Sequence, residues 1–289
     1  MIGRSPLRPT EASTEDEPEF TVFRQTRGWR ALDLREVFRH RDLLKFLVWR
    51  DIKVRYQQTF LGGFWAVLQP LALTAAFSVV FGRIAKIPSD GLPYPLFSFA
   101  GLIVWNFFSG AFNAAVESVA ANSQLIEKVY FPRLILPLAA SARGVVDLGV
   151  ALLAMLALMA AFGFAPSWRL IFLVPLTVVA MAAAVGLGAG LGAVNVRFRD
   201  VRNLMPLITQ LWLFLTPVAY PASLAPPEWR VWLALNPMSG VVEGFRWALL
   251  MTGPPPIDLI AVSTLSALAL LAVGLATFRR MEGAFADVI

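Results

Sequence analysis

Long apolar segments joined by short polar loops constrain this chain of 289 residues more than any other feature. Residues 62–82 and 259–278 each supply about 20 mainly apolar positions, enough to cross the roughly 30 Å hydrocarbon core of a bilayer. Hydrophobic residues make up 57% of the chain and charged residues only 15%, with a mean hydropathy of +0.65, so an ordinary soluble domain is excluded. Since a helix satisfies its own backbone hydrogen bonds in lipid, the pattern predicts an all-α membrane protein.

Six transmembrane helices are expected. Their bounds are 62–82, 96–116, 134–162, 170–195, 204–220 and 258–278. If the N-terminus is cytoplasmic, the inner connecting segments carry 19 Lys and Arg residues and the outer ones carry five. Because positive residues favour the cytoplasmic side, we expect a multi-pass protein of the bacterial inner membrane with both termini in the cytoplasm.

The segment before the last span, 221–257, is too long for a simple turn. It holds two apolar stretches, 231–235 and 247–251, which Pro237, Gly240 and Gly244 separate. Since Pro and Gly interrupt a helix, one continuous span is disfavoured, and two short re-entrant helices in the outer leaflet are expected. An ordered external loop with a few apolar anchors is the alternative.

The domain organisation follows from these spans. We expect a cytoplasmic tail over 1–30, disordered at its polar start, an amphipathic interface helix within 31–61, a six-helix membrane domain over 62–279 and a second cytoplasmic tail over 280–289. With no cysteine and a single histidine, His40, no metal site is expected. The chain contains no Gly-x-x-x-x-Gly-Lys-[Ser/Thr] phosphate loop, so no ATP site is expected in it, and the energy for a transporter subunit of this kind would come from a partner or an ion gradient.

Residues 41–61 have the pattern of a helix that lies on the membrane surface. Leu43, Leu47 and Val54 fall within one narrow arc of a helix. The opposite side carries Asp42, Lys45, Trp49, Lys53 and Tyr56. Basic and aromatic side chains together suit the headgroup region, where cations meet lipid phosphates.

Two charged residues, Arg143 and Asp147, fall inside the third expected span. A charge at mid-membrane costs about 2.5–3.5 kcal/mol on insertion scales, so it normally faces protein or water. At a spacing of four residues the two side chains can pair on one helix face. A structural salt bridge and a position on a transport path are equally favoured, and a proton relay is disfavoured because the other spans lack a second carboxylate.

Aromatic residues are concentrated in the first two spans. The candidate channel-lining residues, besides Arg143 and Asp147, are Phe77, Phe81, Trp105, Phe108 and Phe112. Sugar rings stack on aromatic faces, so such a group is compatible with a glycan path. The alternative for each residue is ordinary packing or contact with lipid.

An ordered string of mixed residue types at 49–62 reads Trp-Arg-Asp-Ile-Lys-Val-Arg-Tyr-Gln-Gln-Thr-Phe-Leu-Gly, followed by Trp65 and Gln69-Pro70. This string resembles the ABC-2-type permease family, and more narrowly the membrane subunits of ABC exporters for O-antigen, capsular polysaccharide and teichoic acid. The resemblance continues through 128–133, 195–200 and 236–238, and covers roughly residues 20–289.

The resemblance implies a permease homodimer above two separate ABC ATPase subunits, which bind ATP and Mg. The substrate implied is a polyprenyl-diphosphate-linked polysaccharide of O-antigen or lipopolysaccharide biosynthesis, and no nucleic acid is involved. The basic and aromatic residues of the interface helix would then guide the lipid diphosphate among membrane lipids. These residues are Trp49, Arg50, Lys53, Arg55 and Tyr56.

The cytoplasmic loop 117–133 would be the ATPase-coupling element of such an exporter. We expect Ser123 to cap a short helix over 124–130 and Pro132 to end it. Its coupling residues would be Gln124, Glu127, Lys128, Tyr130, Phe131, Pro132 and Arg133. A second contact would use Arg197, Arg199 and Asp200.

Three other functions compete with polysaccharide export. The same fold could carry a drug or a simple lipid. An ion-coupled secondary transporter would show interrupted helices with paired carboxylates in both halves, and no such internal repeat is evident. A membrane-embedded transferase would need acid/base groups at one membrane face; the candidates Asp90, Glu228 and Glu243 are scattered in the sequence.

Overall fold

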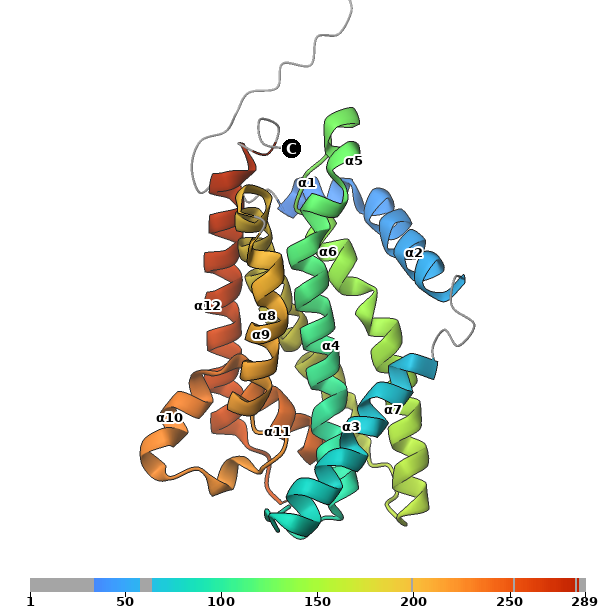
Figure 1. Cartoon of the computed structure of the whole chain (residues 1–289), viewed down its shortest axis with the longest axis vertical. Coiled ribbons are helices and arrows are strands. Elements are labelled where there is room, and N and C mark those ends of the chain that lie inside the picture. Colours follow the sequence, from blue (N-terminus) through green and yellow to red (C-terminus); the bar gives the residue numbers. More distant parts are fainter. Residues whose placement is uncertain (1–33, 58–63, 199, 252, 284, 286–289) are drawn as a thin grey trace, which may run out of the picture. The chain divides into compact units, whose positions relative to one another are not determined.

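The computed structural model describes residues 34–57, 64–198, 200–251, 253–283 and 285, and every regular element within these ranges is a helix (Figure 1). This agrees with the expected all-α class. The expected N-terminal tail over 1–30 lies outside the described residues.

Two helices precede the first span: α1 (Leu34–Arg39) and α2 (Arg41–Gln57). On α2, Leu47 is buried against α6, and Leu43 packs beside it. The apolar arc predicted from the sequence does not extend to Val54, whose side chain is exposed. Phe46 and Trp49 are exposed as well, so the helix presents aromatic side chains outward. Its place on the membrane surface stays a prediction; below, α2 is called the interface helix for this predicted role.

Five helical segments are long and apolar enough to cross a membrane by their length and composition. They are α3 (Phe64–Phe77) with the π-helix η2 (Ser78–Ile84), α4 (Tyr94–Ala121), α6 (Ile135–Ala142) with α7 (Gly144–Ala161), the 3₁₀ turn η3 (Trp168–Phe172) with α8 (Leu173–Arg197), and α12 (Ile257–Glu282). They coincide with five of the six expected spans, with one interruption at Arg143 in the third.

The fifth expected span, 204–220, corresponds to α9 (Asp200–Leu215), which has only 16 residues. The helix ends before Pro217, because proline disfavours helical geometry in the residue that precedes it. Residues 216–220 form a turn instead. The helix begins earlier and ends earlier than the sequence prediction, although it runs alongside α8 (Figure 1).

Helix α4 is the centre of the packing. In its most apolar stretch 78% of the residues are buried, against at most 39% in the other four candidate spans. Helix α8 lies between α4 and α12 (Figure 1). The other spans leave much of their apolar surface exposed, as membrane helices do where they meet lipid or a partner chain.

Glycines on two faces of α8 permit this close packing. On one face, a Cβ at Gly190 would lie 3.1 Å from the Cα of Gly274 in α12. On the other face, a Cβ at Gly192 would lie 3.1 Å from the carbonyl oxygen of Ala115 in α4. Small residues allow helix backbones to approach closely and gain dispersion energy, which replaces the hydrophobic driving force inside a membrane.

The segment before α12 contains two short helices, α10 (Pro227–Leu235) and α11 (Pro237–Leu250), after the 3₁₀ turn η4 (Ala222–Leu224). Between α10 and α11, the side-chain oxygen of Asn236 accepts hydrogen bonds from the backbone N–H of Met238 (3.0 Å) and from Nε1 of Trp212 (3.1 Å). Helix α11 is buried, whereas α10 exposes Trp229 and Trp232. The break between the two helices lies at Asn236-Pro237, as predicted for Pro237. Gly240 and Gly244 do not interrupt the chain as predicted: they lie inside α11, where their lack of a side chain allows close packing against α12 and α8.

Candidate functional site

A polar cavity of about 280 Å³ lies among α2, α3, α4, α6 and α7. Its polar lining residues are Arg55, Gln69, Asn106, Ser109, Asn113, Arg143 and Asp147, and its aromatic ones are Trp65 and Phe107. Four of these five helices, all except α2, belong to candidate membrane spans, so the cavity places polar groups where apolar ones would otherwise be expected.

Asp147 joins the interface helix to the third span. One carboxylate oxygen, Oδ1, accepts a hydrogen bond from the Tyr56 hydroxyl at 2.6 Å, and the other, Oδ2, lies 3.0 Å from Nη2 of Arg55. Burial, followed by this hydrogen bond, raises the pKa of Tyr56 to about 12, so its hydroxyl remains a donor at neutral pH. Residues 91 positions apart in the sequence therefore meet at the cavity.

The ion pair between Arg143 and Asp147, one of the two roles that the sequence allows for these residues, is not formed. Both carboxylate oxygens of Asp147 are engaged by residues of α2, and Arg143 makes no ion pair or hydrogen bond within the described ranges. The prediction considered only neighbours on the same helix, whereas the bonded partners come from a different one. Both residues line the cavity, and their place on a transport path stays a prediction.

The aromatic residues selected from the sequence lie elsewhere. Trp105, Phe108 and Phe112 are buried on α4, where Phe108 contacts Trp212 of α9 edge to face with ring centroids 5.3 Å apart. Phe77 is also buried, against the half-buried Phe81. In the single chain these rings form core, and the cavity is lined by Trp65 and Phe107 instead. Counting aromatics along a span does not reveal which helix each one faces.

The expected coupling helix is α5 (Ser123–Lys128). It is shorter than predicted, and Asn122 rather than Ser123 occupies the N-cap position. The Asn122 side chain does not cap the helix, because its oxygen accepts from Nη2 of Arg50 at 3.1 Å and its nitrogen donates to the Ser118 carbonyl at 2.8 Å. The interface helix is therefore tied to the beginning of the loop.

The residues of the predicted coupling loop divide into two groups. Gln124, Glu127 and Lys128 are exposed, and so is Tyr130, with 68% of its surface accessible.

Phe131, Pro132 and Arg133 of the same loop turn inward. Only 4% of the Phe131 surface is accessible, and Pro132 is buried too. The backbone N–H of Arg133 donates to Oε1 of Glu282 at 3.3 Å, its guanidinium donates to the Glu282 carbonyl, and the same guanidinium lies over the Phe285 ring. The end of the loop is thus anchored to the last turn of α12.

The second predicted contact is described only in part. Arg197 and Asp200 are exposed on either side of Arg199, which lies outside the described residues. Arg197 stacks over the ring of Phe198, with 5.5 Å between its guanidinium carbon and the ring centroid. Any role for these residues in coupling stays a prediction.

The interface-helix residues also divide. Trp49 and Lys53 are exposed. Arg50, Arg55 and Tyr56 bind groups of the protein itself, namely Asn122 and Asp147. Their role toward a lipid diphosphate stays a prediction, and three of the five side chains already have internal partners.

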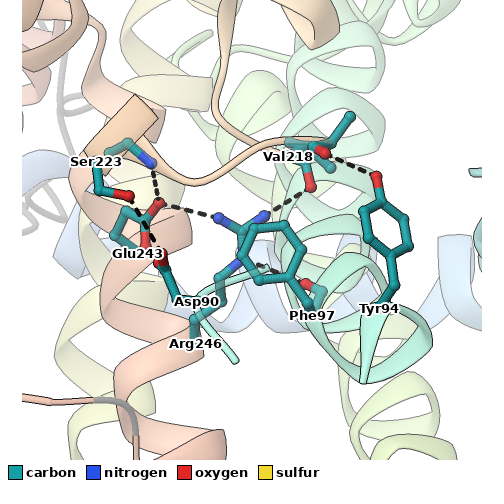
Figure 2. A network of polar contacts seen from close by, with 9 residues as sticks. Asp90, Tyr94, Phe97, Val218, Ser223, Glu243 and Arg246 are labelled. Carbon is teal, nitrogen blue, oxygen red and sulfur yellow. Dashed lines mark hydrogen bonds and ion pairs between the residues drawn. The ribbon is translucent and has the colours of Figure 1, made fainter. Parts of the chain in front are cut away.

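A buried ionic network holds the end of the helices opposite α5 (Figures 1 and 2). Only 1% of the Arg246 surface is accessible. Its guanidinium pairs with Glu243 at 3.0 Å and donates to the carbonyls of Val218 (2.6 Å) and Phe97 (3.2 Å), and Figure 2 shows it against the Phe97 ring. In the sequence, Arg246 is one of the five basic residues counted in the outer segments, and nothing in the pattern predicted its burial. The spacing of three residues between Glu243 and Arg246 was the one sequence signal for this pair, because residues at that spacing share a helix face.

The same network includes two of the carboxylates considered for a transferase. Glu243 accepts a hydrogen bond from the backbone N–H of Ala222 at 2.8 Å as well as pairing with Arg246. Asp90 accepts one from Ser223 at 3.2 Å (Figure 2). The hydroxyl of Tyr94 donates to the Ala219 carbonyl nearby, at 2.7 Å. Glu243 therefore has a structural partner, and the network connects α4, the turn after α9 and α11.

These features define a multi-span helical membrane protein with a polar cavity among its helices and a short exposed helix, α5, at one end. The ABC-2 type transporter family model matches residues 42–250, more than half of the chain. The chain belongs to the ABC-2 type transporter family.

Several curated proteins are similar to the chain. An O-antigen export system permease protein of Myxococcus xanthus is 31% identical over 217 residues, which cover 74% of this chain and 82% of that protein. A protein of the same description from Klebsiella pneumoniae is 25% identical over 249 residues, 86% of this chain and 95% of that protein. A polysialic acid transport protein of Escherichia coli is 25% identical over 239 residues, 81% of this chain and 92% of its own length.

Proposed function

We propose that this chain is the permease subunit of an ATP-driven exporter that moves a polyprenyl-diphosphate-linked, O-antigen-like polysaccharide outward across the cytoplasmic membrane. The observation that carries the proposal is the similarity to O-antigen export permeases over most of both chains. The polar cavity beside the interface helix supports it, because an exporter of a hydrophilic polymer needs polar surface within its membrane helices.

The topology of this permease has six crossings and both termini in the cytoplasm of the inner membrane. Helix α9 supplies the sixth crossing together with the turn at 216–220, and α10 and α11 are re-entrant from the outer face. The distribution of Lys and Arg supports this orientation. The exposed apolar residues of α9, which include Leu204, Leu207 and Leu211, suit contact with lipid or a second permease copy.

Two copies of the permease assemble with two ABC ATPase subunits, which hold ATP and Mg and supply the energy. The exposed side of α5 docks into the ATPase through Gln124, Glu127, Lys128 and Tyr130, and Phe131, Pro132 and Arg133 transmit its movement inward. The exposure of the first group and the burial of Phe131 support this division of roles. Arg197 and Asp200, with Arg199 between them, form the second contact.

Purification of the tagged protein in mild detergent, with an ATPase assay on what co-purifies, tests the assembly. We expect a stoichiometric ATP-binding subunit that is lost when Gln124, Glu127 and Lys128 are changed to Ser together. The matched control changes Glu228, an exposed residue of α10 at the opposite end. A permease that purifies alone would contradict the proposal and favour ion-coupled transport.

Deletion of the gene tests the cargo. We expect the surface polysaccharide to disappear and its lipid-linked form to accumulate inside, with recovery on complementation. Unchanged surface polysaccharide, together with increased sensitivity to drugs, would instead assign the chain to an exporter of drugs or lipids.

A further inference from the structure

The charges around the polar cavity do not balance. Three ionisable side chains line it: Arg55, Arg143 and Asp147. Asp147 is fully occupied by Arg55 and Tyr56, so its charge is neutralised from α2. Among the described residues this leaves one positive charge in excess, on Arg143, about one third of the way along a candidate membrane span.

Unused hydrogen-bonding groups surround this charge. The side-chain amides of Gln69 and Asn106 line the cavity and make no hydrogen bond to any residue in the described ranges. By contrast, Ser109 donates to the Asn106 carbonyl and Asn113 to the Ser109 carbonyl, so these two are satisfied within α4. A charge and two amides without protein partners are costly in a membrane helix unless a ligand or water binds them.

The wall of the cavity also includes an aromatic face. Trp65 lines it, and 51% of the Trp65 surface is accessible. The volume of about 280 Å³ is near the lower end, about 300 Å³, of the range typical of small-molecule pockets. The cavity is thus of a size for one sugar unit and its phosphate rather than for a polymer.

We propose that this cavity binds a sugar phosphate, with Arg143 on the phosphate, Gln69 and Asn106 on the sugar hydroxyls, and Trp65 against the sugar ring. A guanidinium binds phosphate oxygens through two parallel hydrogen bonds, and amides both donate to and accept from hydroxyls. The inference rests on the proposed function in one respect: if the chain exports a lipid-linked glycan, the sugar phosphate bound here is the head of that glycan.

The absence of cysteine from the chain allows a direct test. Gly110 lines the cavity, is exposed, and has no atom within 4 Å of the position where a Cβ would stand. Gly110→Cys therefore places a single thiol in the cavity of the purified full chain. Gly283→Cys is the matched control, because it is equally open but lies at the end of α12. The rate of labelling by a neutral maleimide is measured for each.

We expect glucose 1-phosphate to slow the labelling of Gly110→Cys and to leave Gly283→Cys unchanged. Glucose alone and inorganic phosphate alone are expected to protect less. In the Gly110→Cys background, Arg143→Gln should raise the glucose 1-phosphate concentration needed for half-protection by about tenfold, because one charge-assisted interaction is lost. Arg143→Lys should raise it less. Absence of protection, or equal protection in the Arg143→Gln background, would overturn the proposal. If inorganic phosphate protected as well as glucose 1-phosphate, the proposed binding of the sugar would be overturned.

A further comparison distinguishes a membrane lipid from a soluble sugar phosphate, because both would present a sugar and a phosphate to the cavity. A farnesyl-diphosphate-linked glucose is compared with glucose 1-phosphate at equal concentration. Stronger protection by the prenyl compound assigns the head to a membrane lipid, and equal protection assigns it to a soluble sugar phosphate.

The labelling uses the permease without ATPase, and so its outcome is independent of the export assay. Persistence of surface polysaccharide after gene deletion would remove the proposed function but leave a measured binding site. Loss of surface polysaccharide together with absent protection would remove only this inference.

Discussion

At the scale of single residues, the ionic network around Arg246 shows how a charge is accommodated inside this protein. Its guanidinium donates to two backbone carbonyls and to Glu243, and the Phe97 ring covers one of its faces. Such a planar group with five donors can satisfy several acceptors from different segments at once. Arg246 therefore fixes the relative position of α4, the turn after α9 and α11.

Replacing Arg246 by Met tests this. The substitution removes the cation that pairs with Glu243, which keeps only the Ala222 N–H, and removes the donor to two carbonyls. We therefore expect destabilisation of about 3–5 kcal/mol, as for other buried pairs that lose one partner. Thermal unfolding in detergent measures it. Arg230→Met is the control, because Arg230 is exposed and, among the residues that the structure describes, donates only to the Ala225 carbonyl. Equal melting temperatures for the two variants would contradict the structural role of Arg246.

The bond from Tyr56 to Asp147 has a predictable pH dependence. The pKa of Tyr56 is raised from 10.0 to about 12, so the stabilisation is complete below pH 10 and is lost only as the pH rises toward 12. We therefore expect Tyr56→Phe to lower stability by about 1 kcal/mol, a typical net hydrogen bond, by the same amount from pH 6 to pH 9. A difference between the melting curves that changes across this interval would show that the hydroxyl titrates.

At the scale of elements, α8 depends on glycine on both faces. A Cβ on Gly274 of α12 would collide with the Gly186 carbonyl of α8. Because that carbonyl belongs to the helix backbone, the clash is relieved only if the two helices move apart. By contrast, a Cβ on Gly149 of α7 meets no atom within 4 Å. The same substitution should therefore have opposite effects at the two positions.

We expect Gly274→Ala to destabilise the protein by about 1–3 kcal/mol or more, since it overpacks a helix contact. Gly149→Ala should stabilise by about 0.4–1 kcal/mol, because it only reduces the freedom of the unfolded chain. Melting temperatures measured in detergent should fall for Gly274→Ala and rise for Gly149→Ala. A tolerated Gly274→Ala would mean that α8 and α12 can separate without loss.

The loop after α5 is the element that would carry movement from an ATPase into the membrane domain. Its end is held by Glu282, which also pairs with Arg279 at 3.0 Å. Phe131, Leu134 and Phe278 belong to the same buried cluster as Leu47 of the interface helix. A push on α5 would therefore reach both α12 and α2.

Glu282→Ala should separate docking from transport. The exposed residues of α5 remain, so we expect the ATPase to co-purify as before, while the polysaccharide exported per ATP hydrolysed falls. A cost of about 1 kcal/mol in stability is expected from the lost bonds. Glu228→Ala on exposed α10 is the matched control. An unchanged ratio of export to hydrolysis would show that the contact with α12 is only structural.

At the scale of the whole molecule, the position of α9 decides the topology. If α9 crosses the membrane, residues 124 and 223 lie on opposite sides; if it does not, they lie on the same side. Both Gln124 and Ser223 are exposed, and the chain has no other thiol. We expect an impermeant maleimide to label Ser223→Cys on intact spheroplasts and Gln124→Cys only after lysis. If both variants were labelled only after lysis, residues 124 and 223 would lie on the same side, which would contradict a crossing by α9.

The sequence by itself determined the class of the protein, five of its spans and its family. Span length follows from the thickness of the hydrocarbon layer, and the apolar composition of a segment is a local property. The string at 49–62 is also local, and its resemblance agrees with the family match over 42–250. The early end of α9 was readable too, because Pro217 stands in the sequence.

Only the tertiary structure decided which groups meet. Asp147 binds Tyr56 rather than Arg143, Phe108 and Phe112 lie in the core rather than along the cavity, and Arg246 is buried rather than in a loop. Helical periodicity shows which residues share a face, but it does not show which element that face meets. In a membrane protein the apolar pattern is nearly uniform around each span, so neighbours are selected by close packing at glycines and by the pairing of a few charges, both of which depend on the assembled fold.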